Sequence, residues 1–294
     1  LAPMSLYQIH DEPGFTAPVM VAPLEGWVDA GSSGTTAAAQ LAESGRVVAT
    51  FDADAIYDYR ARRPTLDILD GRPITLEWPQ LTVTATTIED RELLVLTGPE
   101  PDYRWRELAD AAITLAQRFG VASWASLGAI PAAVPHTRPV PILATASASG
   151  LLPSGIRQGP DGLLRVPSAA LSVLELSAAE AGIPADGFFA LGAHYVNATY
   201  PTASTALPTA LGRYLGVELP VGQLATRALE RRNLLDAATA SDEQTKGYVE
   251  RLEGLADESR LPGGDELIAD IERLLREGSG DDEGGEGGGG THRV

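Results

Sequence analysis

The sequence of 294 residues contains no cysteine, a single lysine (Lys246) and only four histidines, at positions 10, 136, 194 and 292. The absence of cysteine excludes disulfides and thiolate-metal sites. Zinc in proteins usually takes several His or Cys ligands, so four dispersed histidines do not favour a metal cage. We therefore predict no metal site.

Long apolar runs are also missing. No apolar stretch reaches the roughly 20 residues that a membrane-spanning helix needs, and no basic segment precedes an apolar one near the start. The chain begins at Leu1, with Met4 close behind, and we assign no structure to these first residues. We expect no membrane association and a cytoplasmic protein.

Positive charge is scarce, because Lys and Arg together number 22 against 40 Asp and Glu, which gives a net charge of −18. From Asp236 onward there are 16 acidic and 6 basic residues. Nucleic-acid binding needs clustered Lys and Arg to contact phosphates, so nucleic acid is not an expected partner. The acidic excess either keeps the protein in solution or attracts a basic protein partner.

The middle of the chain alternates short apolar runs with amphipathic or alanine-rich stretches, which is typical of a parallel or mixed sheet covered by helices. Two of the runs are close enough to form an antiparallel hairpin. We predict helices from Ser32 or Ser33 to Gly45 and over Tyr103–Phe119, Pro167–Ala181 and Ser204–Leu215, and strands over Pro18–Leu24, Val47–Phe51, Leu81–Ile88, Glu92–Leu96, Val121–Leu127, Val140–Ala146 and Gly187–Gly192.

Outside this core we predict a surface excursion over Asp52–Pro79, which carries several Asp and Pro residues. After residue 220 the pattern becomes purely helical. Beyond Glu277 a run rich in Gly and acidic residues cannot bury a core and is expected to be disordered. The predicted organisation is an α/β domain over residues 1–220, a helical extension over 221–277 with helices at Val221–Ala238, Asp242–Leu255 and Gly264–Arg276, and a tail over 278–294.

The stretch Leu127–Ile142 is the most unusual in the chain, because Pro135 and Pro139 enclose the polar residues His136, Thr137 and Arg138. Each proline fixes its own φ and favours extended backbone in the residue before it, so this segment cannot be a helix. One interpretation makes His136 a general acid or base beside an anion-binding Arg138. The other makes the residues structural or part of a contact surface.

A second candidate is the loop Glu25–Gly31, which lies between a predicted strand and a predicted helix, where backbone N–H groups favour an anion. It matches neither the phosphate-binding Walker loop nor the dinucleotide glycine pattern, so we predict no cofactor. A glycine turn with a serine N-cap explains the same residues. Asp29 and Ser33 could belong to a nucleophilic triad, but no Gly-x-Ser-x-Gly elbow exposes the serine.

Four motifs occur in a fixed order along the chain: EGWVDAG at 25–31, TGPEPDYRW at 97–105, LGAIPAAVPHTRPVP at 127–141 and GAHYVNATYPTAS at 192–204. In this combination the sequence resembles the proteasome assembly chaperone 2 family in its actinobacterial form. The resemblance extends from about Val19 to Leu215 and is expected to include the helical extension.

The resemblance implies a three-layer α/β/α sandwich with a mixed, mostly parallel sheet of the phosphorylase and hydrolase kind. It also implies self-association, plausibly as a trimer, and no established catalytic residues. Eukaryotic members act as chaperones for proteasome α-subunits, and archaeal relatives can dock on the core particle through a hydrophobic-Tyr-X ending. The present sequence ends Thr291, His292, Arg293, Val294, without a penultimate tyrosine.

Two functional hypotheses follow. The first is a non-catalytic assembly chaperone or scaffold that presents the motif loops to itself or to a protein partner such as proteasome subunits. The second is a phosphorylase-like enzyme or anionic small-molecule binder that uses Arg138 and His136. The candidate binding or interface residues are Glu25, Gly26, Trp27, Asp29, Gly31, Glu100, Trp105, Pro135, His136, Thr137, Arg138, His194 and Tyr195.

Overall fold

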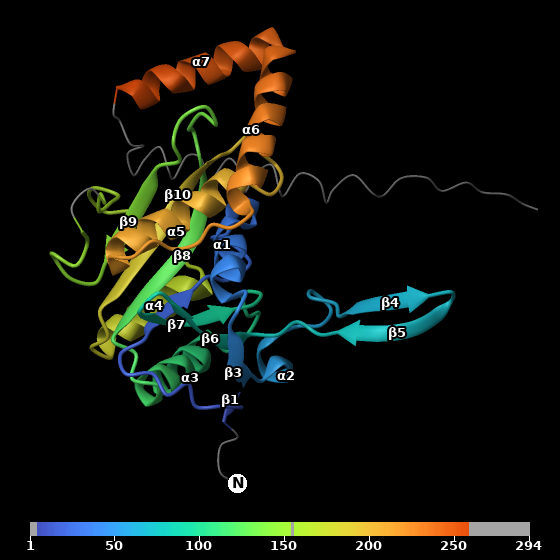
Figure 1. Ribbon diagram of the computed structural model, residues 1–294, viewed down its shortest axis with the longest axis vertical. Coiled ribbons are helices and arrows are strands. Elements are labelled where there is room, and N and C mark those ends of the chain that lie inside the picture. Colours follow the sequence, from blue (N-terminus) through green and yellow to red (C-terminus); the bar gives the residue numbers. More distant parts are fainter. Residues whose placement is uncertain (1–4, 154–155, 259–294) are drawn as a thin grey trace, which may run out of the picture.

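The computed structural model describes residues 5–153 and 156–258, and in them the chain forms an eight-stranded sheet with the order β1-β3-β6-β7-β2-β8-β10-β9 (Figure 1). A separate pair of strands, β4 and β5, forms a second small sheet. The strands are β1 (Tyr7–Ile9), β2 (Val19–Ala22), β3 (Arg46–Phe51), β4 (Thr65–Leu69), β5 (Arg72–Glu77), β6 (Thr82–Ile88), β7 (Arg91–Thr97), β8 (Ser123–Ala132), β9 (Ile142–Ala146) and β10 (Ala185–Ala193).

The centre of the large sheet is parallel. Strand β2 pairs in parallel with β7 on one side and β8 on the other, and β10 pairs in parallel with β8. Strands β1, β6 and β9 run antiparallel to their neighbours, which makes the sheet mixed. The predicted hairpin is confirmed as β6 and β7, whose pairing continues to Ile88 and Arg91 at the turn.

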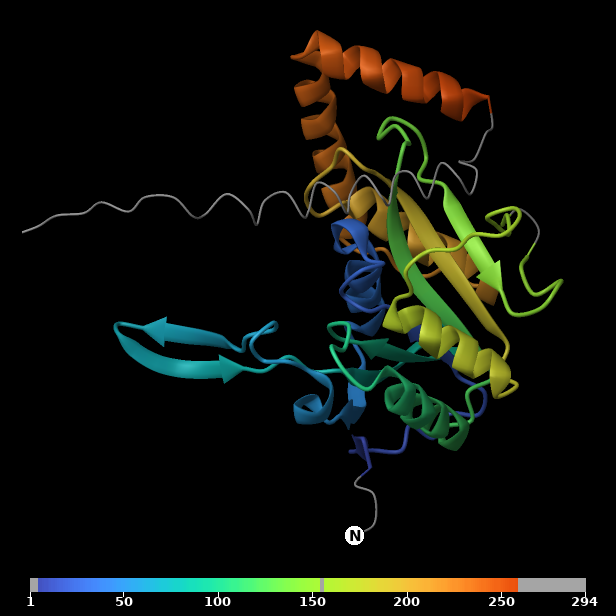
Figure 2. The same ribbon diagram turned by 180° about the vertical axis from the view of Figure 1, so that it is seen from behind.

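Helices cover both faces of the sheet. Helices α1 (Ser33–Ala42) and α5 (Pro201–Leu215) pack on one face, and α3 (Trp105–Arg118) and α4 (Ala170–Glu180) pack on the other (Figures 1 and 2). Strand β2 shows how the sequence produces two cores, because Met20 lies in the core with α3 and α4, whereas Val19 and Val21 lie in the core with α1 and α5. The predicted α/β/α sandwich is confirmed.

Strand β8 continues beyond its predicted end at Leu127 to Ala132. The extension contains Pro131, which has no N–H to donate. The Ala129 N–H donates to the Val28 carbonyl (3.0 Å), on the side of β8 that faces β2. The nitrogen of Pro131, two residues later, faces the same side, but β2 has ended at Ala22 and, among the described residues, no strand there needs a donor. A proline is tolerated there, and the rigid loop begins only after the strand.

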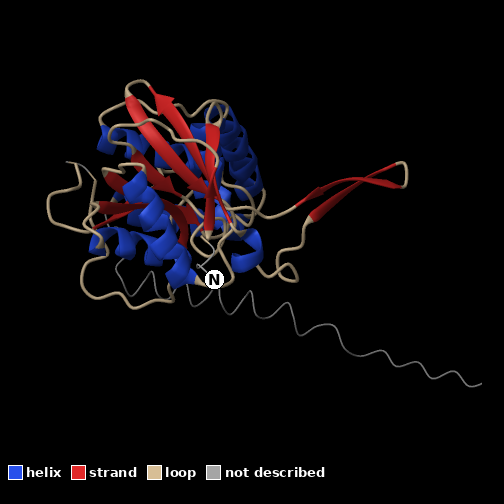
Figure 3. Cartoon of the chain, turned by 90° about the horizontal axis from the view of Figure 1, so that it is seen from below, coloured by secondary structure: helices blue, strands red, loops and turns tan. Residues whose placement is uncertain are grey.

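The predicted excursion over residues 52–79 lies at the surface, as expected, but it is not irregular. It contains the short helix α2 (Ala53–Ile56) and the β4–β5 hairpin, which projects away from the sheet domain (Figures 1 and 3). Every residue of β4 and β5 is exposed. We call this hairpin, residues 65–77, the arm.

Two helices follow the sheet domain, α6 (Leu224–Ala240) and α7 (Glu243–Asp257). Their ends lie within three residues of those predicted for the helices Val221–Ala238 and Asp242–Leu255. The side chain of Asp242 caps α7 by accepting from the Thr245 N–H at 2.9 Å. The helix predicted at 264–276 and the tail predicted at 278–294 lie outside the described residues. Within the described ranges, no helix combines the length and apolarity needed to cross a bilayer.

One buried carboxyl in β10 makes stability depend on pH. Asp186 is fully buried, and among the described residues neither of its oxygens has a hydrogen-bond partner with good geometry. Burial raises the pKa of the Asp186 carboxyl above its usual value, and the nearby Tyr214 hydroxyl offsets this only in part. The folded state therefore holds this proton more tightly than the unfolded chain, and the stability that the proton contributes is lost as the pH rises.

We expect the substitution Asp186→Asn to raise the free energy of unfolding at pH 7, because the amide removes the buried charge. The gain is about 1.4 kcal/mol for each unit by which folding raises the pKa, and it shrinks as the pH falls towards the usual Asp range. Urea unfolding of both proteins from pH 4 to pH 8 measures it. The exposed control Asp67→Asn should show no such trend, and an equal gain at pH 4 and pH 8 would contradict the account.

Candidate binding and interface site

The four sequence motifs follow the four adjacent parallel strands. Residues 25–31 come after β2, residues 98–105 after β7, residues 133–141 after β8, and residues 194–200 after β10. Parallel strands place their carboxyl ends at one edge of the sheet, so the motifs meet there. The candidate residues are therefore brought to one edge, where they form separate clusters and not a single centre.

In the first cluster, the side chain of Asp29 caps the N-terminus of α1. Its Oδ1 accepts from the Gly34 N–H at 2.6 Å, and the Thr35 hydroxyl donates to its Oδ2 at 2.5 Å. Ser32 occupies the predicted N-cap position, but it does so in a left-handed conformation and its side chain makes no cap bond, so Asp29 supplies the cap in its place. Burial raises the pKa of the Asp29 carboxyl, while these hydrogen bonds act to lower it. The N-terminus of α1 thus already holds an anion, which belongs to the protein.

Ser33 has no nucleophilic arrangement. Its hydroxyl donates to the Ala30 carbonyl at 2.7 Å, and its side chain is buried. Gly31, with φ of 62°, forms the turn before the helix, and its carbonyl accepts from the Tyr200 N–H at 3.0 Å. The structure therefore does not support a triad built on Asp29 and Ser33.

Glu100 organises the second cluster. Its Oε1 accepts from the Ala170 N–H (2.7 Å) at the start of α4, and its Oε2 accepts from the Trp27 N–H (3.3 Å). Gly26 is required by this contact, because a Cβ on it would lie 2.8 Å from the Glu100 side chain. The backbone of Glu25 pairs with the 98–100 segment. The carboxylate therefore joins the loops after β2 and β7 to α4 on the sheet face.

The tryptophans near these loops do not form one pocket. Trp27 is 45% exposed, whereas Trp124 is fully buried in the core. Trp105 is partly buried, and its indole N–H donates to the Pro101 carbonyl at 2.6 Å. Core packing explains Trp105 and Trp124, and of the three residues only Trp27 offers a large exposed surface.

His136 lies at the centre of the third cluster, with a side chain that is completely buried. Its backbone N–H and its Nδ1 each lie 2.7 Å from the Tyr195 hydroxyl, and its Nε2 lies 3.1 Å from Asp236 Oδ1 of α6. Burial lowers the pKa of His136, and the Asp236 carboxylate partly offsets this. Arg232 donates to both Asp236 and the His136 carbonyl.

Arg138 is bound by α7. Its Nε and Nη2 donate to the two carboxylate oxygens of Asp257 at 2.8 Å each, and its Nη1 donates to Glu253 Oε1 at 3.1 Å. The Thr137 hydroxyl also donates to Glu253. Because Arg138 and His136 are both occupied by residues of this chain, they are not free to bind an anionic substrate in this conformation. The phosphorylase-like hypothesis needed free side chains at Arg138 and His136, and this conformation does not provide them.

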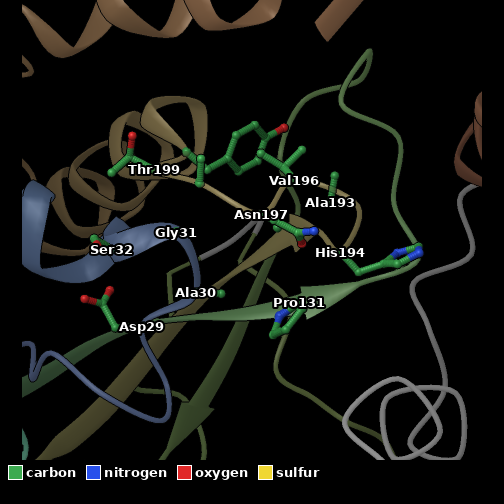
Figure 4. A pocket seen from close by; sticks show the side chains of 13 residues that line it. Asp29, Ala30, Gly31, Ser32, Pro131, Ala193, His194, Val196, Asn197 and Thr199 are labelled. Carbon is green, nitrogen blue, oxygen red and sulfur yellow. The ribbon is translucent and has the colours of Figure 1, made fainter. Parts of the chain in front are cut away.

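A cavity of about 380 Å³ opens beside this cluster, between the loop that precedes α1 and the loop that follows β10 (Figure 4). Asp29, Gly31 and His194 line it, and His136 and Arg138 do not. The ring of His194 is held by the Ala132 carbonyl at Nδ1 (3.1 Å) and by the Tyr248 hydroxyl of α7 at Nε2 (3.2 Å). In the described part of the chain, no group of three His, Asp or Glu side chains is arranged to hold a metal ion.

Sequence reasoning missed the residues of α6 and α7 that contact the motif loops. The contacts that Asp236, Glu253 and Asp257 make with the loop after β8 span 100 residues or more of sequence. The contact of Tyr248 with His194 spans 54 residues. The acidic excess after residue 236 was the available signal, because carboxylates in a helical extension need cationic partners and Arg138 is one.

We expect the substitution Asp29→Ala to lower the free energy of unfolding by about 2 kcal/mol, because it removes a helix cap and leaves buried N–H and O–H donors unpaired. The substitution Ser32→Ala removes the residue at the N-cap position itself, which makes no cap bond, and should change stability by less than about 0.5 kcal/mol. Chemical unfolding of both variants compares them. A larger loss for Ser32→Ala would restore the serine-cap prediction.

Comparisons with known proteins agree with the motif resemblance. The model of the PAC2 family matches residues 24–239. The crystal structure of a Mycobacterium tuberculosis protein of unknown function, Rv2714, is similar at 30% sequence identity and a TM-score of 0.83, covering 94% of this chain and 98% of its own. No curated protein matches.

Two further solved structures carry descriptive names. Rv2125 of Mycobacterium tuberculosis, described as a proteasome-assembly chaperone homologue, is 31% identical with a TM-score of 0.72, covering 79% of this chain and 99% of its own. PbaB of Pyrococcus furiosus, described as an archaeal proteasome activator, is 18% identical with a TM-score of 0.62 over 79% of this chain and 97% of its own. The latter likeness shows the fold alone.

Proposed function

This chain belongs to the PAC2 family, and from that premise we propose that it is a non-catalytic assembly chaperone or scaffold protein that acts on proteasome subunits in the cytoplasm. It works as a homo-oligomer, and the proposed state is a trimer. The motif residues at the sheet edge shape contact surfaces and do not transform a substrate. The name of the related Rv2125 protein supports the link to the proteasome.

The observation that carries the proposal is the apolar face of the arm. Cross-strand partners point to the same face, and Leu66 pairs with Leu76. The alternation along each strand, with a bulge after Asp67, adds Ile68 and Ile74 to that face. These four side chains are between 47% and 61% exposed. Thr65, Asp67, Thr75 and Glu77 occupy the opposite face.

An isolated two-stranded hairpin is marginally stable in water, and a contiguous apolar face on one marks a contact with another protein. The arm carries a net charge of −2, from Asp67, Asp70 and Glu77 against Arg72, and Asp67 and Glu77 lie on the face opposite the apolar one. These features support self-association through the arm. An enzyme that acted alone would gain nothing from such an arm.

We expect the double substitution Ile68→Thr/Ile74→Thr to convert the oligomer into single chains, because threonine keeps the β-branched shape while it removes apolar contact area. Size-exclusion chromatography with light scattering measures the mass. The opposite-face control Thr65→Ser/Thr75→Ser should keep the wild-type mass. A wild-type protein that is a single chain at every concentration would contradict self-association, and an unchanged mass in the threonine variant would exclude the arm.

We also expect the tagged full-length protein to retain proteasome α-subunits or their assembly intermediates during purification from its own cells. A strain that lacks the protein should accumulate incomplete proteasome particles. Native gels and mass spectrometry measure both outcomes. An unchanged proteasome profile in the deletion strain, together with no retained subunits, would contradict the proposed partner while leaving self-association intact.

A further inference from the structure

Helix α7 contacts Thr137, Arg138, His194 and Tyr195, and we call the surface formed by these four residues the α7-covered surface (Figure 2). These residues come from two of the four motif loops. The PAC2 family model ends at residue 239, four residues before α7 begins. The covered surface is thus part of the family core, while the helix that covers it lies outside the matched region.

The contact between α7 and this surface is mainly polar. Val249 and Leu252 are the only buried residues of α7. The ion pairs that Arg138 makes with Glu253 and Asp257 are partly open to solvent, since the three side chains are 35%, 26% and 58% exposed. Salt screens such partly exposed pairs, and only the pair with Asp257 has the bidentate geometry that makes an exposed ion pair effective. The attachment of α7 is therefore specific in geometry and sensitive to salt.

The sequence of α7 also weakens the helix itself. Gly247 and Gly254 lie inside it, and glycine is the poorest helix former after proline. Neither glycine is required by packing, because a Cβ at either position would have no neighbour within 4 Å. Alanine would therefore fit at both positions and strengthen the helix. The glycines leave α7 easier to unfold or displace than its contacts require.

We propose that the α7-covered surface is a binding site for an acidic helical segment of a protein partner, and that α7 is its internal competitor. The partner segment carries two carboxylates four residues apart, as Glu253 and Asp257 do, because that spacing places both on one helix face. Arg138 binds the pair, with one bidentate contact, and Thr137 donates to the first carboxylate.

This inference deepens the proposed function by giving the chemistry of the partner segment, and it rests on that function only in assuming a protein partner. The surface holds two carboxylates with helical spacing, so an acidic helix of the same spacing matches it. When α7 leaves, its carboxylates leave as well, so the local charge becomes more positive and attracts an acidic helix to a chain that is acidic elsewhere.

A fluorescent peptide of residues 242–258 serves as the probe, and fluorescence anisotropy measures its binding to the full-length protein. The substitutions Glu253→Gln/Asp257→Asn in the protein loosen α7, and we expect them to tighten peptide binding about tenfold relative to wild type. The substitutions Gly247→Ala/Gly254→Ala strengthen α7, and we expect them to weaken peptide binding about tenfold. Raising the salt concentration should weaken binding in every case.

Arg138 provides the decisive control. In the loosened protein, Arg138→Ala should abolish binding, whereas Arg165→Ala, in an exposed loop, should leave it unchanged. Arg138→Lys, which keeps the charge but not the bidentate geometry, should bind with intermediate affinity and replaces the alanine variant if that variant does not fold. A peptide with both carboxylates changed to amides should not bind.

The inference is overturned if the peptide binds none of the proteins, binds equally well after Arg138→Ala, or binds equally well without its two carboxylates. Equal binding to the loosened and strengthened proteins would show that α7 does not compete. None of these measurements contains a proteasome, so a negative result here leaves the proposed function standing. If the protein binds the peptide but retains no proteasome subunits, the binding site is supported and its partner is a protein other than the proteasome.

Discussion

The parallel alignment of β7, β2, β8 and β10 is the constraint on which the rest of the structure depends. It places four carboxyl ends, and the loops that follow them, along one edge of the sheet. It also directs the N-termini of helices towards that edge, where their unpaired N–H groups need acceptors. Asp29 supplies the acceptor for α1, and Glu100 supplies it for α4 while holding the neighbouring loop. Internal carboxylates thus occupy positions where other α/β proteins bind anionic ligands.

Sequence patterns were sufficient for the layers of this fold and for the position of its motifs. Apolar runs such as the one around Val19–Ala22 have the length of buried strands, and motif loops after parallel strands had to share an edge. Local rules failed where the contact was distant or unusual. The preference of serine for N-cap positions could not reveal that Asp29, which lies outside the helix, caps α1. Pro131 made the end of β8 hard to predict, because the sequence near it does not show that β2 has already ended.

The arm shows a different limit of sequence reading. Its alternation of Leu66, Asp67 and Ile68 is that of a half-buried strand, but the Asp and Pro residues around it indicated a surface excursion. The arm lies at the surface, as predicted, and it is also a regular hairpin. An apolar pattern predicts that a face will be buried without stating which molecule buries it. A single sequence therefore cannot distinguish a core strand from one that awaits a second chain.

The arm and α7 differ in the kind of protein contact to which they are suited. The arm presents apolar side chains, whose burial is strong and insensitive to salt, and this suits a permanent contact between like subunits. The attachment of α7 relies on half-exposed ion pairs and on a helix weakened by Gly247 and Gly254, and this suits a contact that must open. The proposed assembly role would use both properties, because such a protein holds its own architecture while it releases its partner. The buried ring of His136 joins the loop after β8 to Tyr195 and to Asp236 of α6. These contacts hold in place the surface that α7 covers.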